Sequence, residues 1–484
     1  MFGLDNRTML ARDIINILDN SDEALSAEKI QKKLGRSNVI TINDVCKHLM
    51  YIASNEYGND DYFVKIETPE RGSYRLERQS TNLQSLYKAI FETDLSYLIL
   101  MTVIQNREFS THDFCGKHHV SFSTVQRKVK AINKEINTFQ VHITCSYRIK
   151  FNSDELLIRS FSHLFFWSLH REISNNLFFL DYDHYIKEAE KVVAYLEKPY
   201  DPLNVRSIAL WMKLFSIGIA KKQQLRMSPE KEELMQSFSI PEKPDFLPFW
   251  NENDWYALVG IMNVTGIYPF DLVFDKEKLG YFIKAEDLSP ETFLECSETY
   301  FGPAGAASVA TITRLVHRYQ LLKVFIEPNT KSELRSITKH ILSFTKIKKV
   351  NPLYWKNFVA FWKELKEMLP ITEQSSYLRY SCLMICLEAF PIDSCRPLIK
   401  VHLSSDFDVL YEGMLKQLIR SRFNQTYQIQ FIEELQAADM ILTTTPLNKQ
   451  VLSEKQKHLI IHSQLSEKDL KKLSHLFNEL ILYR

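Results

Sequence analysis

The chain has 484 residues, more than a single hydrophobic core usually organises, so we expect several domains. Its 45% hydrophobic and 25% charged residues exclude a disordered or fibrous protein, and only 12 glycines and 16 prolines favour helices packed on helices. The formal net charge of +1 excludes a uniformly basic protein but not a local basic patch.

Targeting and redox signals are weak along the chain. Residues 1–20 have no apolar signal core, and no stretch reaches the roughly 18 uncharged apolar residues of a membrane span. We therefore expect a cytoplasmic protein without a membrane partner. The seven cysteines are scattered without a CxxC pair, which predicts reduced core thiols, no metal site and no cofactor.

The first 80 residues follow the order of a winged helix-turn-helix domain. Ser26 is the expected N-cap of a short second helix, and Gly35 is expected to end it at a turn. A hairpin turn is expected between Pro69 and Gly72. The predicted elements are helices over 7–18, 26–34 and from Thr41 or Asn43 onward, and strands over 62–67 and 73–76.

The same order of elements recurs over residues 81–155. This region begins with a helical linker near 83–91, and Ser110 or Thr111 is expected to cap the first helix of the turn. The predicted elements are helices over 94–105, 111–117 and 121–139, and wing strands over 140–144 and 147–151. A repeated supersecondary unit is more informative than a single one, so we predict two winged helix-turn-helix domains.

Positive charge is concentrated in the second unit. Residues 111–150 carry seven Lys and Arg side chains against two acidic ones, although the whole chain is nearly neutral. The apolar stripe of helix 121–139 consists of Val125, Val129, Ile132 and Ile136. Side chains at the helix start would meet base edges, and later ones and the wing would meet phosphates. The predicted DNA contacts are Ser121, Ser123, Thr124, Gln126, Arg127, Lys128, Lys130, Lys134, Arg148 and Lys150.

The first unit has a less positive surface. Its candidate DNA contacts are Thr41, Asn43, Lys47 and Arg71. Several acidic side chains lie among them, so we expect the second unit to dominate DNA affinity.

Residues 154–396 read as successive helices with aromatic inner faces and no catalytic signature. A histidine that accepts a phosphoryl group needs nearby donors to hold the phosphate. His317 lies between Arg314 and Arg318, and His170 precedes Arg171, so these two are the candidate phosphorylation sites.

From residue 397 onward, strand and helix patterns alternate. Strands are expected over 398–403, 427–432, 439–443 and 457–462, with a helix up to about Arg422 and another over 465–482. Alternation of this kind predicts a small parallel α/β domain. Ser404 and Ser405 follow the first strand without a histidine, an acid or a glycine-rich cradle in a recognisable arrangement, so we favour an interaction domain over a catalytic one.

This order of parts resembles the Mga/AtxA family of virulence regulators. The local strings that carry the resemblance are SFSTVQRKVK at 121–130 and VHLSSD at 401–406. The resemblance implies a mostly α, multidomain chain. Its parts would be two winged helix-turn-helix domains (1–80 and 81–155), two all-α PTS regulation domains (156–287 and 288–396) and an α/β domain similar to enzyme IIB (397–484).

The resemblance also implies how such a protein is regulated. Phosphotransferase-system phosphocarrier proteins would phosphorylate His170 and His317 and so couple sugar supply to DNA binding. Enzyme IIB domains of this type carry the phosphoryl group on a cysteine after the first strand. Here that loop has Ser404 and Ser405 instead, while Cys395 precedes the strand. This departure favours self-association of the terminal domain over phosphoryl transfer.

We therefore predict a non-enzymatic regulator of transcription, an activator, that binds double-stranded DNA and forms a homodimer through its regulation and C-terminal domains. The alternative is a phosphotransferase-system phosphocarrier component without DNA binding. An RNA-binding antiterminator is disfavoured because its N-terminal module would be small and β-rich, unlike residues 1–76.

Overall fold

The computed structural model describes residues 2–58, 64–79, 83–169, 181–268, 276–283, 287–326, 347–348, 351–369, 376–446 and 456–482. The chain divides into two compact units, Met1–Lys284 with Leu321–Ile337 and Ala285–Gln320 with Thr338–Arg484. Both are built mainly from helices, with three small sheets in the described residues. The expectation of a mostly α chain is confirmed.

The first helix-turn-helix unit has the predicted elements in the predicted order, with one further short strand before the second helix. It consists of α1 (Asn6–Asp19), β1 (Leu25–Ser26), α2 (Ala27–Leu34), α3 (Val39–Tyr57), β2 (Val64–Glu67) and β3 (Ser73–Arg78). Ser26 accepts a hydrogen bond from the Lys29 amide, and Gly35 ends α2 with a φ of 65°. Helix α3 begins earlier than predicted because Asn38 is its N-cap and accepts from the Thr41 amide at 2.8 Å.

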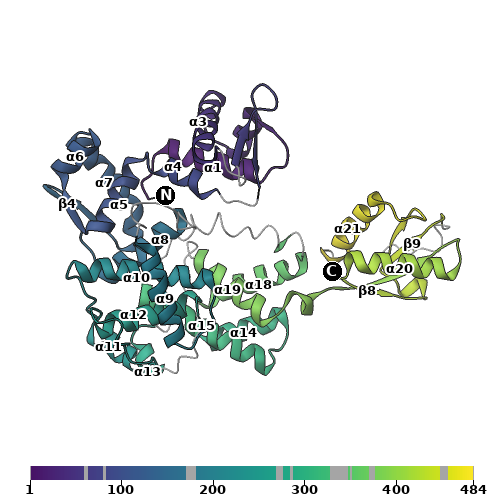
Figure 1. Ribbon diagram of the computed structural model, residues 1–484. Coiled ribbons are helices and arrows are strands. Elements are labelled where there is room, and N and C mark those ends of the chain that lie inside the picture. The colour runs from purple at the N-terminus through teal and green to yellow at the C-terminus, as the bar shows by residue number, and fades with distance from the viewer. Residues whose placement is uncertain are drawn as a thin grey trace. The chain divides into compact units, whose positions relative to one another are not determined.

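The second unit repeats this architecture (Figure 1). It consists of α5 (Leu95–Asn106), β4 (Glu108–Ser110), α6 (Thr111–His118), α7 (Phe122–Ile136), β5 (Ile143–Cys145) and β6 (Arg148–Phe151). In each unit an antiparallel three-stranded sheet pairs the short first strand with the last one, in the orders β1-β3-β2 and β4-β6-β5. The predicted helix 121–139 ends sooner, because residues Asn137–Phe139 form a 3-10 turn.

The linker between the two units is α4 (Gln84–Phe91), as predicted. Its Leu86 and Ile90 are buried in the hydrophobic core of the first unit. The Tyr87 hydroxyl donates to Asn16 of α1 at 2.8 Å. Helix α4 therefore belongs structurally to the first unit.

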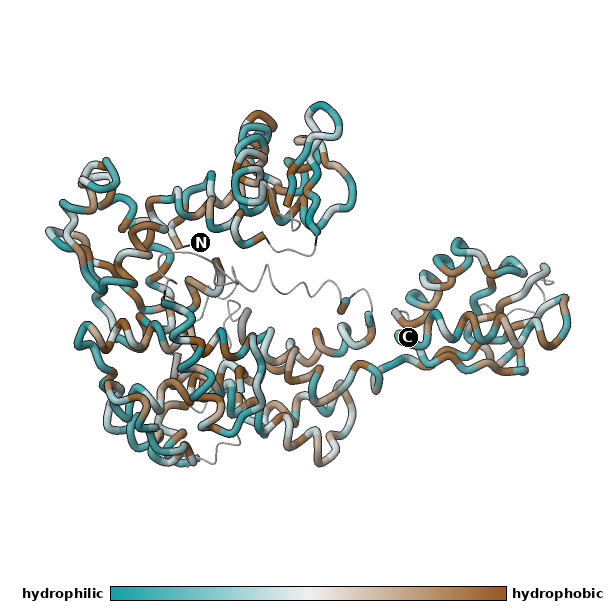
Figure 2. The backbone as a smooth tube through the Cα atoms, in the orientation of Figure 1, coloured by the Kyte–Doolittle hydropathy of each residue, from teal (hydrophilic) through white to brown (hydrophobic). Residues whose placement is uncertain are grey.

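The helical body comprises α8 (Glu155–Leu169), α9 (Tyr182–Tyr195), α10 (Pro202–Ala220), α11 (Pro229–Gln236), α12 (Glu252–Thr265), α13 (Lys276–Gly280), α14 (Pro290–Phe301), α15 (Ala306–Ile326), α18 (Pro352–Met368) and α19 (Ser376–Ala389). Hydrophobic and hydrophilic segments alternate along these helices in Figure 2, as amphipathic packing requires. Among the described helices α10 is long and apolar enough to cross a membrane, but most of it is buried inside the protein, and it carries Arg206 and Lys213. It is the core helix around which α8, α9 and α12 pack.

The C-terminal segment is a parallel α/β fold, as predicted. It contains β7 (Leu398–Ser404), α20 (Val409–Phe423), β8 (Gln428–Phe431), β9 (Met440–Thr443), β10 (Lys457–Ile460) and α21 (Glu467–Leu482). All strand pairs are parallel, in the order β10-β9-β7-β8. Its core joins Val401 and Met440 of the sheet to Leu415 of α20 and Phe477 of α21.

Candidate nucleic-acid interface

The reading helix of the second unit, α7, has a firmly fixed start. His119 turns the chain at the end of α6 with a left-handed φ of 52°. The Ser121 hydroxyl then caps α7 by accepting from the Thr124 amide at 3.2 Å, and it lies 3.0 Å from the Ser123 hydroxyl and 2.9 Å from that of Thr124. Three predicted DNA contacts thus form one hydrogen-bonded cluster at the helix start.

The two faces of α7 divide as the sequence predicted. Val125, Val129, Ile132 and Ile136 are buried. The exposed polar residues of the helix and its wing include Ser123, Gln126, Arg127, Lys130, Lys134, Arg148 and Lys150. Among the described residues, Arg127, Lys130 and Lys134 have no acidic partner within ion-pair distance. The positive charge of this face is therefore available to an anionic ligand.

Two of the predicted basic contacts are engaged within the protein. The Lys128 ammonium pairs with the Asp5 carboxylate, and the Lys128 side chain is only 16% exposed. Arg148 on β6 pairs with Glu108 on β4 at 3.0 Å, although both side chains remain exposed. Lys128 therefore differs from its neighbours on α7, and its amphipathic position alone did not reveal this, because Asp5 is 123 residues away.

Two exposed aromatic residues were missed by the sequence analysis. Phe122 is the first residue of α7 and 48% exposed, and Tyr147 in the wing turn is 95% exposed. The backbone of the wing turn is tied to α6, because Thr111 donates its amide to the Tyr147 carbonyl at 3.0 Å and its hydroxyl to the Ser146 carbonyl at 2.7 Å. A large apolar residue directly after an N-cap was the available signal for Phe122.

The corresponding face of the first unit is less basic. Thr41, Lys47 and Arg71 are exposed, but the Asn43 side chain accepts from the Tyr74 hydroxyl at 2.9 Å. Arg75 on the wing is paired with two glutamates. The exposed side chains of α3 also include the apolar Ile40 and Tyr51.

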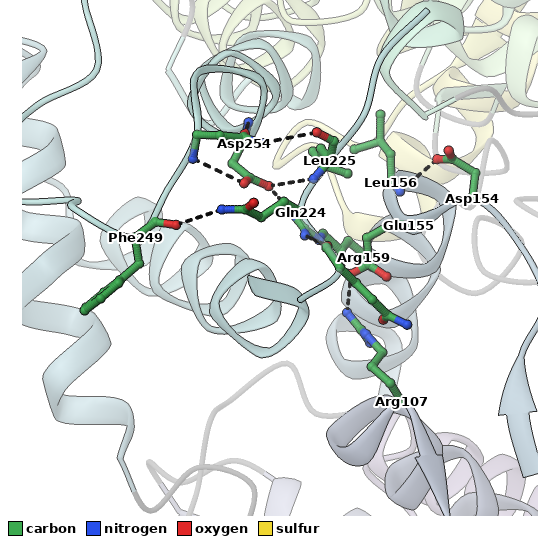
Figure 3. A network of polar contacts seen from close by, with 11 residues as sticks. Arg107, Asp154, Glu155, Leu156, Arg159, Gln224, Leu225, Phe249 and Asp254 are labelled. Atoms are coloured by element: carbon green, nitrogen blue, oxygen red, sulfur yellow. Dashed lines mark hydrogen bonds and ion pairs between the residues drawn. The ribbon is translucent and has the colours of Figure 1, made fainter. Parts of the chain in front are cut away.

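A buried polar network joins the second unit to the helical body (Figure 3). Arg107 follows α5 with a φ of 62° and donates to Glu155, at the start of α8, at 2.7 Å. Glu155 also accepts from Arg159 at 2.9 Å, and Arg159 donates to Asp254 of α12 at 2.6 Å. Burial lowers the pKa of Arg107, and the Glu155 carboxylate opposes that shift. Since β4 begins directly after Arg107, the network connects the wing sheet to α8 and α12.

The candidate phosphorylation sites differ in what the structure describes. His170 lies outside the described residues. His317 is half-buried on α15, where Arg314 is exposed one turn earlier and Arg318 is half-buried. In the described part of the chain, no group of three or more His, Cys, Asp or Glu side chains is arranged to hold a metal ion.

The loop after β7 carries negative charge where a phosphate-binding loop needs donors. Ser405 accepts from the Phe407 amide at 3.1 Å, and the Asp406 amide donates to Thr444 at 3.0 Å. Asp408 is the N-cap of α20 and accepts from the Tyr411 amide at 2.8 Å. The Asp406 and Asp408 carboxylates would repel a phosphoryl group at this helix start.

A wing beside a helix-turn-helix, with cations on the reading helix that have no acidic partner among the described residues, is typical of a winged helix-turn-helix DNA-binding protein. Residues 79–166 match the family model of the Mga helix-turn-helix domain. The match covers α4, the whole second unit and most of α8, and it confirms the resemblance to the Mga family there. A helix-turn-helix domain of this family indicates a DNA-binding transcriptional regulator. No curated protein is significantly similar to the chain.

Proposed function

We propose that this protein is a cytoplasmic transcriptional activator that binds double-stranded DNA chiefly through α7 and the wing of its second unit. The observation that carries the proposal is the set of exposed cations Arg127, Lys130 and Lys134, unpaired among the described residues, within the segment that matches the Mga helix-turn-helix domain. Ser123, Gln126 and Arg127 near the helix start would read base edges. Lys130, Lys134 and Lys150 would contact phosphates.

A titration of labelled genomic fragments at two salt concentrations tests this proposal. Binding that weakens steeply as salt rises, with some fragments retained at the higher salt, is the expected result. Equal retention of every fragment would remove sequence-selective regulation, and no binding at either salt would remove the function.

We further propose that phosphorylation of His317, and of His170, by phosphotransferase-system phosphocarrier proteins tunes DNA binding. The proposal for His317 is supported by Arg314 and Arg318 on the same helix, which supply guanidinium donors for a phosphate. Incubation with the phosphocarrier proteins and phosphoenolpyruvate, followed by phosphosite mapping, tests it. A stable histidine phosphate favours regulation, whereas label that passes onward to a sugar would favour a phosphocarrier.

We propose that the protein forms a homodimer in which the C-terminal α/β fold takes part. Leu410, Met414 and Leu418 are spaced four residues apart on α20 and are 84%, 44% and 43% exposed. Large apolar residues on one face of a helix are costly in water and favour burial against a second copy. Met414→Glu and Leu418→Glu should convert the dimer to a monomer in sedimentation, and an unchanged mass would exclude this helix.

A further inference from the structure

Residues Phe2–Asp5 precede the first helix-turn-helix unit in sequence but contact the second one. The Gly3 carbonyl accepts from the Ser96 hydroxyl of α5 at 2.7 Å. The Asp5 amide donates to Asp94, the N-cap of α5, at 2.7 Å, and the Asp5 carboxylate pairs with Lys128 of α7. This short segment therefore bonds to two helices of the second unit immediately before α1 begins.

Gly3 lies directly against the backbone of the reading helix. A Cβ atom at this position would be 2.8 Å from both Cα and N of Ile132, closer than real Cβ contacts allow. Its φ of 72° is also in the left-handed region that favours glycine. The backbone of this segment therefore packs against the backbone of α7 with no room for a side chain at position 3.

Phe2 anchors the segment in the helical body. Its side chain is only 3% exposed, and its ring meets those of Phe161 and Phe165 on α8 edge-on, with centroids 5.8 and 5.4 Å apart. Phe2, Gly3 and Asp5 together touch α5, α7 and α8.

The two helix-turn-helix units are also joined covalently, at the bend between α4 and α5. Helix α4 leads into α5 through Glu92, Thr93 and Asp94, and Phe91 stacks on Tyr97 across this bend. A single bend of this kind leaves rotation free about its own axis. The Asp5–Lys128 ion pair and the contact of Gly3 with Ile132 lie on α7, away from this bend, so they restrict that rotation.

We propose that residues Phe2–Asp5 are a positioning element that locks the second reading helix to the first unit, so that the two units read DNA as one body with a fixed offset. The contacts of Phe2–Asp5 do not depend on the proposed function, whereas their effect on DNA binding rests on it. Gly3 and Asp5 do not contact DNA themselves; they fix the position of α7, and Lys128 takes part by pairing with Asp5.

The lock is tested without DNA by measuring the distance between spin labels on the two reading helices. Genetically encoded labels at the exposed positions Ser54 on α3 and Ala131 on α7 leave the native cysteines untouched. The labelled protein without further substitutions should give a narrow distance distribution between the two labels, and Gly3→Ala or Asp5→Asn should broaden it. Asp5→Asn keeps the backbone bond to Asp94 and removes only the charge, so it guards against a variant that fails to fold.

Two matched controls separate the lock from general strain. Gly35→Ala places a methyl at another left-handed glycine, with a φ of 65°, that has no neighbour within 4 Å. Asp13→Asn removes a carboxylate whose ion pairs, with Arg12 and Arg36, stay within the first unit. Both controls should keep the narrow distribution. Unchanged widths for both Gly3→Ala and Asp5→Asn would overturn the proposal.

The consequence for DNA is tested with a bound duplex into which five base pairs are inserted between the two footprints, about half a helical turn. The wild type should lose affinity at least about tenfold, because only one unit can then bind at a time. The same insertion should lower the DNA affinity of the Gly3→Ala variant much less. Equal losses in both proteins, or none in the wild type, would overturn the fixed offset. A failure to bind any DNA would refute the proposed function instead and leave the spin-label result to decide the lock.

Discussion

Arg159 and Asp254 form a fully buried ion pair across 95 positions of sequence, with 2.6 Å between Nη1 and Oδ1. Such a pair does not by itself stabilise a fold, because two ions lose their hydration. Removing one partner, however, strands the other charge in the core. Arg159 is further held by the Glu155 carboxylate and by the Gln223 carbonyl at 2.7 Å, so it cannot turn toward water.

Asp254→Ala should therefore lower the free energy of unfolding by about 3–5 kcal/mol. Thermal or urea unfolding followed by circular dichroism measures the loss. The matched control is Glu367→Ala, which removes the exposed i,i+4 pair with Lys363 and should cost less than about 0.5 kcal/mol. Equal losses in the two variants would mean that the network is not energetically special.

Gly218 on α10 lies against the same network. A Cβ there would be 2.6 Å from Arg159 Nη2 and in closer conflict with the Glu155 carboxylate. Gly218→Ala should destabilise by about 1–3 kcal/mol, although alanine is the better helix former. Gly116→Ala on α6, where no atom lies within 4 Å, should instead be neutral or stabilise by up to about 1 kcal/mol. Unfolding curves that rank the two variants in the opposite order would contradict this account.

We expect His163 on α8 to make the unfolding free energy of the helical body depend on pH. Its ring stacks on Trp211 with centroids 4.0 Å apart, and its Nε2 is buried without a hydrogen-bond partner in the described structure. Burial lowers the pKa of His163 from 6.5 to about 3. The unfolded chain therefore binds an extra proton between pH 6.5 and about 3, so the stability that the neutral ring provides is lost as pH falls through that window.

Between pH 7 and pH 5 this contribution should lower the unfolding free energy by about 2 kcal/mol. His163→Phe has no such proton, so its unfolding free energy should fall less over the same interval. Urea unfolding at the two pH values measures the difference. The same pH dependence in both proteins would show that the ring is already solvated.

Much of the fold followed from local patterns in the sequence. The inner stripe of α7 was predicted because residues at helical spacing face one side, and Ser26, Gly35 and Ser110 marked helix ends through their own side chains or backbone. Strands β1 and β4 were missed because two or three residues carry no readable alternation. Their existence depends on pairing with the wing strands.

The features missed at the candidate site depend on distant partners. Nothing near Lys128 in the sequence shows that Asp5 will neutralise it. Arg159 sits in an apolar helix, where periodicity alone gives no partner for a buried guanidinium. The division of the helical body into two regulation domains, and the phosphorylation of His170 and His317, stay predictions.

The measurement that tests the DNA-binding claim most directly compares the salt dependence of duplex binding for the wild type, Lys130→Ala and Lys128→Ala. Because Lys130 is exposed and unpaired among the described residues, its loss should weaken binding and reduce the slope of log K against log salt by about 0.9. On a duplex that carries only the footprint of the second unit, where the offset between the two helix-turn-helix units has no effect, Lys128→Ala should leave that slope unchanged because the Lys128 ammonium is already paired with Asp5. A Lys130→Ala slope equal to that of the wild type would contradict the assignment of α7 as the principal DNA-contacting helix.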